Sequence, residues 1–388
     1  MQPALSADES LHWLALRMSA GVGTRKAGRL VEIFRTPQAI FRASRSELEA
    51  AGLSAGVAQS VASGCAFEEA AEQQEKVAKL GVVLVPITDS MYPARLREIF
   101  DPPPLLYARG RVELLGNLML GVVGTRRPTP YGKQVAERLS RDLCEAGLTI
   151  ASGMARGIDT SAHRAVLEAG GDTIAVFGCG VDEVYPAENR KLAETLSEKG
   201  LVISEFPMGA PPFPQNFPVR NRIISGMSAG VLVVEGGEYS GSTITAKLAA
   251  EQNREMFAVP GNVTSKMSWG PNLLIKQGAK LVQEWNDVVT ELKGEDRRRL
   301  VEQCRNLLNL NEKIGDESRG VNLASEINGN SRAILKALRH DAPVGLDALI
   351  DSLEGLGASD IIASLFELEL GGMVRQLPGK SYIKVWAE

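Results

Sequence analysis

Short apolar runs that end in glycine-rich turns recur through the middle of the chain, and a stretch with helical spacing of apolar residues follows each turn. The runs are rich in Val, Ile and Leu and cover residues 118–123, 148–151, 173–177 and 231–234. Such alternation is typical of buried parallel strands joined by crossover helices. The pattern therefore predicts an α/β protein with a doubly wound sheet, in which ligands bind at the carboxyl ends of the strands.

The segments on either side of this region predict further elements. Apolar runs at residues 81–87 and 105–108 indicate two more strands, which extend the sheet. Residues 11–62 have the spacing of short helices, and the C-terminal part has that of three helices followed by a β-hairpin, the winged-helix pattern. The predicted organisation is a helical module at residues 1–65, an extended sheet domain at 66–292, a charged linker at 293–329 and a winged-helix domain at 330–388.

The helical module contains the turn Gly21-Val22-Gly23 between two helical segments, and Thr24 is placed to cap the second. A helix, a G-x-G turn and a second helix resemble a helix-hairpin-helix unit, whose turn can present backbone N–H groups to a DNA phosphate. A single G-x-G is a weak signal, so the alternative is a small packing module without a ligand.

In the winged-helix segment, the third predicted helix at residues 358–370 carries Glu367 and Glu369 and almost no base. This argues against reading of a DNA major groove, and a protein-contact or purely structural role stays open.

Composition limits the classes of partner. The 388 residues are 44% hydrophobic and 23% charged, with a net charge of −4, so any nucleic-acid site must be a local concentration of Arg and Lys. The four cysteines show no metal-ligand spacing and only three histidines are present, so we expect no metal site. No signal pattern and no apolar run of membrane-spanning length occur, so we expect a cytoplasmic protein without membrane contact.

The glycine-rich turns do not match the common nucleotide-binding motifs. Residues 124–128 lack the G-x-G-x-x-G spacing of dinucleotide sites, and the second strand ends in Ser152 rather than in an acidic residue. Residues 236–243 have the glycine spacing of a P-loop, but Ser242 stands where lysine is required. NAD and ATP are therefore poorly supported, and we expect no cofactor.

Basic and aromatic residues gather at these turns instead. Arg126 and Arg127 follow the first strand and Arg156 follows the second, while residues 213–222 bring together Phe213, Asn216, Phe217, Arg220, Asn221 and Arg222. No acidic residue lies between Pro207 and Val234. Arginine presents a planar donor fork to phosphate and an exposed Phe stacks on bases, so the pattern favours a site for single-stranded nucleic acid. The alternative is that the Phe side chains pack a loop and the arginines pair with carboxylates.

Two further features could carry chemistry but have simpler interpretations. Asp159 and His163 lie four residues apart on one helix face, as a general-base pair or metal ligands could. Asp159 falls in the first helical turn, where a carboxylate satisfies N–H groups, and no nucleophile accompanies the pair, so a structural role is favoured. Cys179, between two glycines, is likewise interpreted as a small buried residue rather than a nucleophile.

Several segments, taken together and in this order, resemble one protein family. They are residues 121–128 (GVVGTRRP), 152–159 (SGMARGID), 217–226 (FPVRNRIISG) and 241–243 (GST), with YP at 92–93 and VPGN at 259–262. Over nearly its whole length the chain resembles the DprA (Smf) family of DNA-processing proteins. The resemblance implies an extended Rossmann-like domain that binds single-stranded DNA in a basic pocket and forms a homodimer. It also implies protection of incoming strands in natural transformation, loading of the RecA recombinase onto them, an N-terminal module of the helix-hairpin-helix or sterile-alpha-motif type, and a C-terminal winged helix.

The resemblance also implies roles for single residues. Arg126 would clamp a phosphate with support from the backbone of Gly124, Thr125 and Gly153, and Phe217 would stack on a base. The other residues expected to line the pocket are Arg220, Asn221 and Arg222, with hydroxyls from Ser242 and Thr243. Arg127, Arg156 and Asn216 complete the candidate set from the residue pattern.

The family implies a protein without enzymatic activity. The alternative class is a nucleotide-processing enzyme, a phosphoribohydrolase of the lysine-decarboxylase-like group, because that group places a Gly-Gly-x-Gly-Thr turn over a phosphate. Residues 236–243 are loosely similar to this turn, although the turn here is longer and no Glu follows within the next helical turn.

Overall fold

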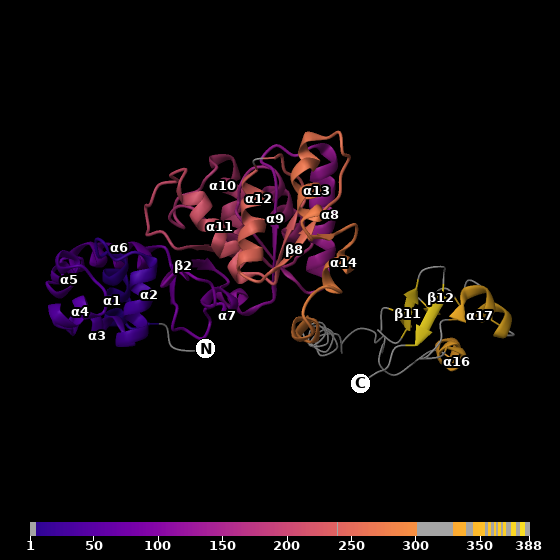
Figure 1. Cartoon of the computed structure of the whole chain (residues 1–388), viewed down its shortest axis with the longest axis horizontal. Coiled ribbons are helices and arrows are strands. Elements are labelled where there is room, and N and C mark those ends of the chain that lie inside the picture. The colour runs from indigo at the N-terminus through magenta and orange to yellow at the C-terminus, as the bar shows by residue number, and fades with distance from the viewer. Residues whose placement is uncertain are drawn as a thin grey trace. The chain divides into compact units, whose positions relative to one another are not determined.

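The computed structural model describes residues 5–238 and 240–300 and, in the C-terminal part, residues 329–338, 344–353, 356–357, 361, 364–365, 368–369, 374–377 and 381–384. The chain forms two compact units, Met1–Asn306 and Leu307–Glu388 (Figure 1). The first unit holds the predicted helical module and the predicted sheet domain, and the second holds the predicted winged-helix segment. Among the described residues, no helix combines the length and the apolar character needed to cross a membrane.

A nine-stranded sheet forms the centre of the first unit. Its strand order is β1 (Val83–Pro86), β2 (Leu105–Gly110), β6 (Leu201–Ser204), β5 (Thr173–Val176), β4 (Thr149–Ser152), β3 (Met119–Val123), β7 (Gly230–Val233), β8 (Glu255–Ala258) and β9 (Lys280–Leu281). The strands from β6 to β9 are parallel, and β2 and β1 join them as an antiparallel edge. The predicted doubly wound sheet, extended by two more strands, is confirmed.

The order of the strands creates one switch point. From β3 the chain moves through β4 and β5 to β6 in one direction, and it then returns to place β7 on the other side of β3. In register, Val123 of β3 lies opposite Val233 of β7. The turns that leave these two strands therefore lie side by side, at the position where open α/β sheets bind ligands.

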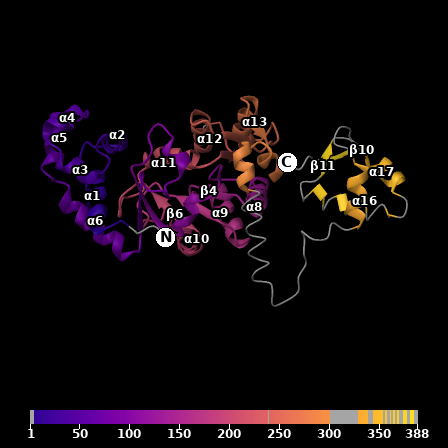
Figure 2. The same cartoon turned by 90° about the horizontal axis from the view of Figure 1, so that it is seen from below.

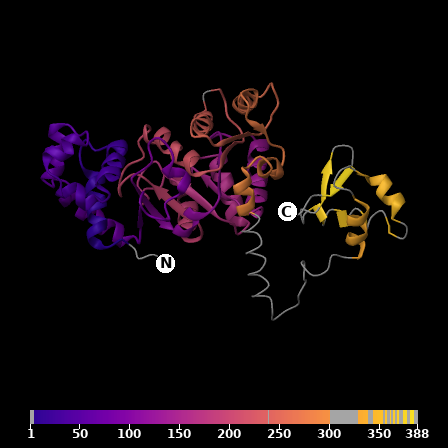
Figure 3. The same cartoon turned by 60° about the horizontal axis from the view of Figure 1, so that its bottom comes forward.

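Helices cover both faces of the sheet (Figures 2 and 3). One face carries α7 (Ala94–Arg97), α11 (Asn216–Met227), α12 (Gly241–Glu251) and α13 (Trp269–Lys276). The other carries α8 (Pro130–Glu145), α9 (Ile158–Glu168), α10 (Arg190–Lys199) and α14 (Trp285–Val289). Burial on both faces explains why the central strands have continuous apolar sequences, since Met119 and Val123 of β3 enter one core and Leu120 and Val122 the other. Short 3₁₀ turns lie at Val112–Gly116, Ala187–Asn189 and Lys266–Ser268.

Six helices precede the sheet: α1 (Ala7–Met18), α2 (Thr24–Phe34), α3 (Pro37–Arg42), α4 (Arg45–Ala50), α5 (Ala55–Ala62) and α6 (Phe67–Lys79). Capping boxes begin two of them, with Ser6 and Glu9 at α1 and Ser44 and Glu47 at α4. The predicted cap at Thr24 is wrong by one residue, because Gly23 is the N-cap of α2 and provides no side-chain hydrogen bond.

The helical module packs directly onto the sheet domain. Trp13 and Leu14 of α1 share a buried apolar cluster with Tyr107 of β2. Gln73 of α6 is also buried, and it accepts a hydrogen bond from the N–H of Met208 at 3.0 Å and donates one to the carbonyl oxygen of Met208 at 3.2 Å. The two parts of the first unit are therefore joined by shared core and by buried polar contacts.

The second unit is described by itself. It contains α16 (Gly329–Ala337), α17 (Leu346–Ser352) and an antiparallel sheet in the order β10 (Val344–Gly345), β12 (Ser381–Lys384), β11 (Val374–Leu377). These elements correspond to the first two helices and the hairpin of the predicted winged helix. Glu369 is exposed, whereas Glu367 and most of the third predicted helix lie outside the described residues. Residues 294–300 of the predicted linker are helical, and residues 301–328 also lie outside the described part.

Replacing Gln73 with Ala is expected to lower the free energy of unfolding by about 2 kcal/mol, because a buried N–H and a buried carbonyl lose their partner. Gln74, the next residue of α6, donates one hydrogen bond to Ala7 from a half-buried position, so Gln74→Ala is the matched control with a much smaller expected effect. Urea unfolding measures both variants. Equal midpoints for the two would contradict this role of Gln73.

Candidate functional site

A cavity of about 640 Å³ opens at the switch point, where the carboxyl ends of β3 and β7 meet. Hereafter it is called the switch-point cavity. Its walls are the turn after β3 (residues 123–127), Ala155 and Asp159, several residues between Pro212 and Ile224, and the start of α12 (residues 240–242, 244 and 245). Tyr185 and Met267 also line it. Segments that are far apart in the sequence therefore converge on one hollow.

Glu235 fixes the turn that carries Arg126. The carbonyl oxygen of Glu235 accepts a hydrogen bond from the N–H of Thr125 at 2.7 Å. The Glu235 carboxylate, which is buried, accepts bonds from the N–H and the hydroxyl of Thr129 at 2.8 and 2.6 Å. With its backbone held in this way, the turn leaves the side chains of Arg126 and Arg127 exposed at the rim.

Two aromatic rings and one guanidinium group form a cluster at the mouth of the cavity. The guanidinium carbon of Arg126 lies 5.7 Å from the ring centroid of Phe217, and the ring of Tyr185 lies 5.4 Å from that of Phe217. Phe217 is half-buried and packs close to Gly178, where an added Cβ would lie 3.0 Å from the ring. Arg126 forms no ion pair with any residue in the described part of the chain. Arginine beside aromatic rings is an arrangement that binds phosphate and base together.

A buried positive charge lies at the floor of the cavity. Arg220 is 4% exposed, and its Nη1 donates to the carbonyl oxygen of Val176 at 2.9 Å. Its Nε atom has no hydrogen-bond partner among the described residues. Burial lowers the pKa of Arg220 to about 10, against the opposing attraction of Asp159, so the side chain stays protonated at neutral pH.

The start of α12 provides the opposite wall. Ser240 is its N-cap and accepts a hydrogen bond from the N–H of Ser242 at 3.4 Å, and the two hydroxyl oxygens lie 2.8 Å apart. A helix start that faces a cavity presents N–H groups and a partial positive charge to an anion. The wall therefore has the same preference for negative charge as Arg126 and Arg220.

Comparison with known proteins identifies the family. A family model described as DNA recombination-mediator protein A matches residues 83–293, more than half of the chain, and one described as the DprA winged helix domain matches residues 323–380. The chain belongs to the DprA (Smf) family.

Individual relatives agree with this assignment. DNA processing protein DprA of Bacillus subtilis is 46% identical, over 55% of this chain and 72% of its own. Protein Smf of Synechocystis is 34% identical, over 96% of this chain and 98% of its own. The crystal structure of DprA from Streptococcus pneumoniae matches with a TM-score of 0.65 at 34% identity, over 75% of this chain and 99% of that chain. The structure of DprA from Helicobacter pylori matches with a TM-score of 0.50 at 30% identity, over 54% of this chain and 97% of that chain. The family resemblance and the C-terminal winged helix inferred from the sequence are confirmed.

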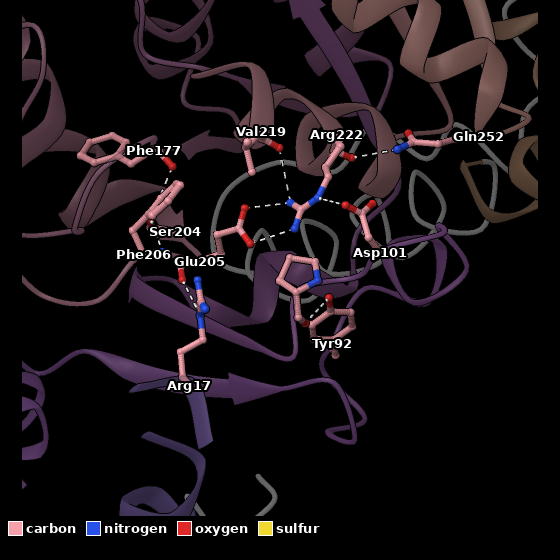
Figure 4. Close-up of polar contacts among 11 residues, drawn as sticks. Arg17, Tyr92, Asp101, Phe177, Ser204, Glu205, Phe206, Val219, Arg222 and Gln252 are labelled. Atoms are coloured by element: carbon pink, nitrogen blue, oxygen red, sulfur yellow. Dashed lines mark hydrogen bonds and ion pairs between the residues drawn. The ribbon is translucent and has the colours of Figure 1, made fainter. Parts of the chain in front are cut away.

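The structure corrects the placement of Arg222. Its guanidinium group points away from the switch-point cavity and donates two hydrogen bonds of 2.8 Å to the carboxylate of Glu205 and one of 3.0 Å to Asp101 (Figure 4). Both Arg222 and Glu205 are buried. The absence of acidic residues between Pro207 and Val234 did not leave Arg222 free for a ligand. Its partner Glu205 precedes that range, and its partner Asp101 is distant in the sequence.

Four other candidates do not line the switch-point cavity directly. Arg156 pairs with Glu188 at 2.6 and 3.0 Å and, with Gly153, borders a small adjoining cleft. The amide group of Asn216 donates to the carbonyl oxygen of Pro211 at 3.4 Å. Thr243 is buried, and its hydroxyl oxygen lies close to Gly270. The candidates that do converge on the cavity are Gly124, Thr125, Arg126, Arg127, Phe217, Arg220, Asn221 and Ser242.

Asp159, His163 and Cys179 have the geometry of structural residues. Asp159 accepts hydrogen bonds from the N–H groups of Gly153 at 3.1 Å and Ala155 at 3.3 Å, and burial raises its pKa. The Nδ1 atom of His163 lies 2.7 Å from the hydroxyl of Thr173, and burial lowers the pKa of His163 to about 3. Burial raises the pKa of Cys179 to about 12, which makes its thiol a poor nucleophile. No group of potential ligands able to hold a metal ion occurs among the described residues.

Two residues of this site are not among the candidates predicted from the sequence. Tyr185 lies in a loop outside the quoted motifs, and only its proximity to Phe217 gives it a role. Glu235 carried a detectable signal, because a carboxylate two residues after the end of the buried strand β7 needs hydrogen-bond partners.

Substituting Arg222 with Met is expected to lower the free energy of unfolding by about 3–5 kcal/mol, because Glu205 keeps a buried charge without its partner. Adding Glu205→Gln should recover part of the loss, since a neutral amide is less costly to bury. Arg156→Met, which breaks an exposed pair, is the control and should leave the unfolding midpoint unchanged. Equal urea midpoints for Arg222→Met and Arg156→Met would show that the buried pair contributes no stability.

Proposed function

We propose that the protein binds single-stranded DNA in the switch-point cavity. The observation that carries this proposal is the cluster of Arg126, Phe217 and Tyr185 above the buried charge of Arg220. A duplex hides the faces of its bases in the stack, whereas an unpaired strand offers them to aromatic side chains. A site that joins a ring to several phosphate-binding groups therefore fits a single strand better than a duplex or a small anion.

Each wall has a part in this proposal. Arg126 and Arg127 at the rim would bind phosphates, and Ser242 at the start of α12 would bind another from the opposite side. Phe217 would stack on a base, with Tyr185 extending the stacking surface. Arg220 would attract the backbone from below through the charge of its buried guanidinium group.

The relatives support the proposal. The solved structure of Helicobacter pylori DprA is described as showing a single-stranded DNA binding mode, and its chain is 30% identical to this one over 54% of this chain. By membership of a recombination-mediator family, we further propose that the protein acts as a homodimer. In this proposal it protects incoming strands in natural transformation and helps to load RecA onto them.

Catalysis is not part of the proposal. Asp159 is the carboxylate that lines the cavity in the described part of the chain, and Glu235 holds the turn after β3; both accept hydrogen bonds from backbone N–H groups. A phosphoribohydrolase would need a carboxylate free to exchange a proton with its substrate. These contacts do not favour the alternative of a nucleotide-processing enzyme.

Arg126→Ala is expected to weaken binding of oligo-dT and to reduce the slope of log K against log salt by about 0.7, the loss of one phosphate contact on a single strand. Phe217→Leu should weaken binding roughly 5-fold or more without changing the slope, because it removes stacking and no charge. Arg164→Ala, an exposed arginine of α9 outside the cavity, is the control. Wild-type affinity in both site variants, or release of free base from nucleoside monophosphates, would count against the proposal.

RecA loading is tested separately. On a strand coated beforehand with a single-strand-binding protein, RecA should begin to hydrolyse ATP sooner when the wild-type protein is present. Arg126→Ala should lose most of this effect, because the variant binds the strand weakly. An equal lag with and without the protein would contradict the loading role and leave DNA binding untouched.

A further inference from the structure

A second and larger cavity lies between the helical module and the sheet domain. It has a volume of about 920 Å³ and is lined by α2, by the turn that contains Gly52, and by residues of the segment 87–102 that follows β1. We call it the module groove. Both of its walls belong to the first compact unit.

Positive charge is concentrated in the module groove. Five cationic side chains line it, and Glu32 is the one carboxylate among its lining residues; the cations are Arg25, Lys26, Arg29, Arg35 and Arg97. In the whole chain acidic residues outnumber Lys and Arg by 47 to 43, so this excess is local. All five cations are exposed, and none forms an ion pair with a residue in the described part of the chain. Unpaired cations around a hollow create a potential that attracts a polyanion.

The charged residues at the start of α2 destabilise that helix. The first turn of α2 carries Arg25 and Lys26 and no acidic residue, whereas α1 begins with Asp8 and Glu9. Cations at a helix start are opposed by the helix dipole. A phosphate in the module groove would relieve this opposition, because it pairs with the cations and with the dipole.

An exposed ring indicates what kind of anion fits. Phe100 is 79% exposed, and the guanidinium carbon of Arg25 lies 4.3 Å from its ring centroid. An exposed aromatic side chain beside arginine is a stacking platform for a base. A small inorganic anion would make no use of that ring, whereas a nucleotide offers a phosphate to the cations and a base to Phe100, so the groove favours nucleic acid.

An ion pair links the loop that borders the module groove to α11, part of which lines the switch-point cavity. Phe100 and Pro102 line the groove, and Asp101 between them pairs with Arg222 at 3.0 Å. Arg222 directly follows Asn221, which lines the switch-point cavity. This ion pair, drawn in Figure 4, joins the loop to α11.

We propose that the module groove is a second nucleic-acid site, which binds the phosphate backbone and one base of the same single strand that occupies the switch-point cavity. This inference rests on the proposed function for the identity of the strand. It gives α2 a role in extending the length of DNA that each protein molecule holds.

The test compares the full chain with Arg25→Ala/Arg29→Ala and with Phe100→Ala. Arg97 is left in place because it donates to the carbonyl oxygens of Ile87 and Asp89 and holds that loop. Arg42→Ala, an exposed arginine of the same module outside the groove, is the control. Binding is measured over a range of salt with dT strands of about 5 and about 20 nucleotides, which bracket the usual site sizes of single-strand-binding folds, and with a duplex of the longer length.

For the longer strand, the double variant should reduce the salt slope by about 1.4, two lost phosphate contacts, and Phe100→Ala should weaken binding roughly 5-fold or more. Binding of the short strand should stay unchanged in both, whereas Arg126→Ala should weaken binding of both strands. Wild-type binding of the longer strand by both groove variants would overturn the inference and leave the proposed function intact. An effect on the duplex alone would also overturn it. If the groove variants bind the longer strand more weakly and Arg126→Ala binds it normally, the module groove remains a nucleic-acid site. The switch-point cavity is then rejected as one.

Discussion

Arg220 lies beneath the turn that follows β4, and only a glycine at position 153 leaves room for its guanidinium group. A Cβ at Gly153 would lie 1.7 Å from Nη1 of Arg220. The space that the missing side chain leaves lets a charged group lie inside the protein, where low polarity strengthens its attraction for an anion. Asp159 is held by the same turn and stabilises that charge without forming an ion pair within 4 Å. The glycine-rich sequence after β4 therefore serves mainly to place a buried cation under the cavity, and the exposed residues at the rim act in the field that it creates.

Arg220 and Arg222, which are separated by one residue in α11, have different surroundings. Arg220 faces the cavity floor and keeps one nitrogen atom without a partner, while Arg222 faces the opposite way and is neutralised by Glu205 and Asp101. The first contributes a positive charge to the cavity, and the second joins α11 to the segments around β6 and α7. In helical geometry, residues two apart lie about 200° apart around the axis, which explains the division.

Much of the fold could be predicted from the sequence, because strands buried on both faces give continuous apolar runs and the turns between them are rich in glycine. The motifs around Arg126 and Phe217 were likewise visible as local patterns. The roles of Arg222 and Arg156 could not be predicted in this way, since their partners Glu205, Asp101 and Glu188 lie outside the local segments. Tyr185 and the module groove arise only when distant segments meet, as Arg25 of α2 meets Phe100 before β2. Contacts between distant segments decide which arginines form ion pairs and which do not, and local composition does not.

We propose an unpaired strand in the switch-point cavity, with one base against the ring of Phe217. Photocrosslinking with an oligo-dT strand that carries a single 5-iododeoxyuridine, followed by mass spectrometry of the full chain, tests it most directly. We expect adducts on the peptides that contain Phe217 or Tyr185. Adducts found only on peptides of the second unit, Leu307–Glu388, would contradict it.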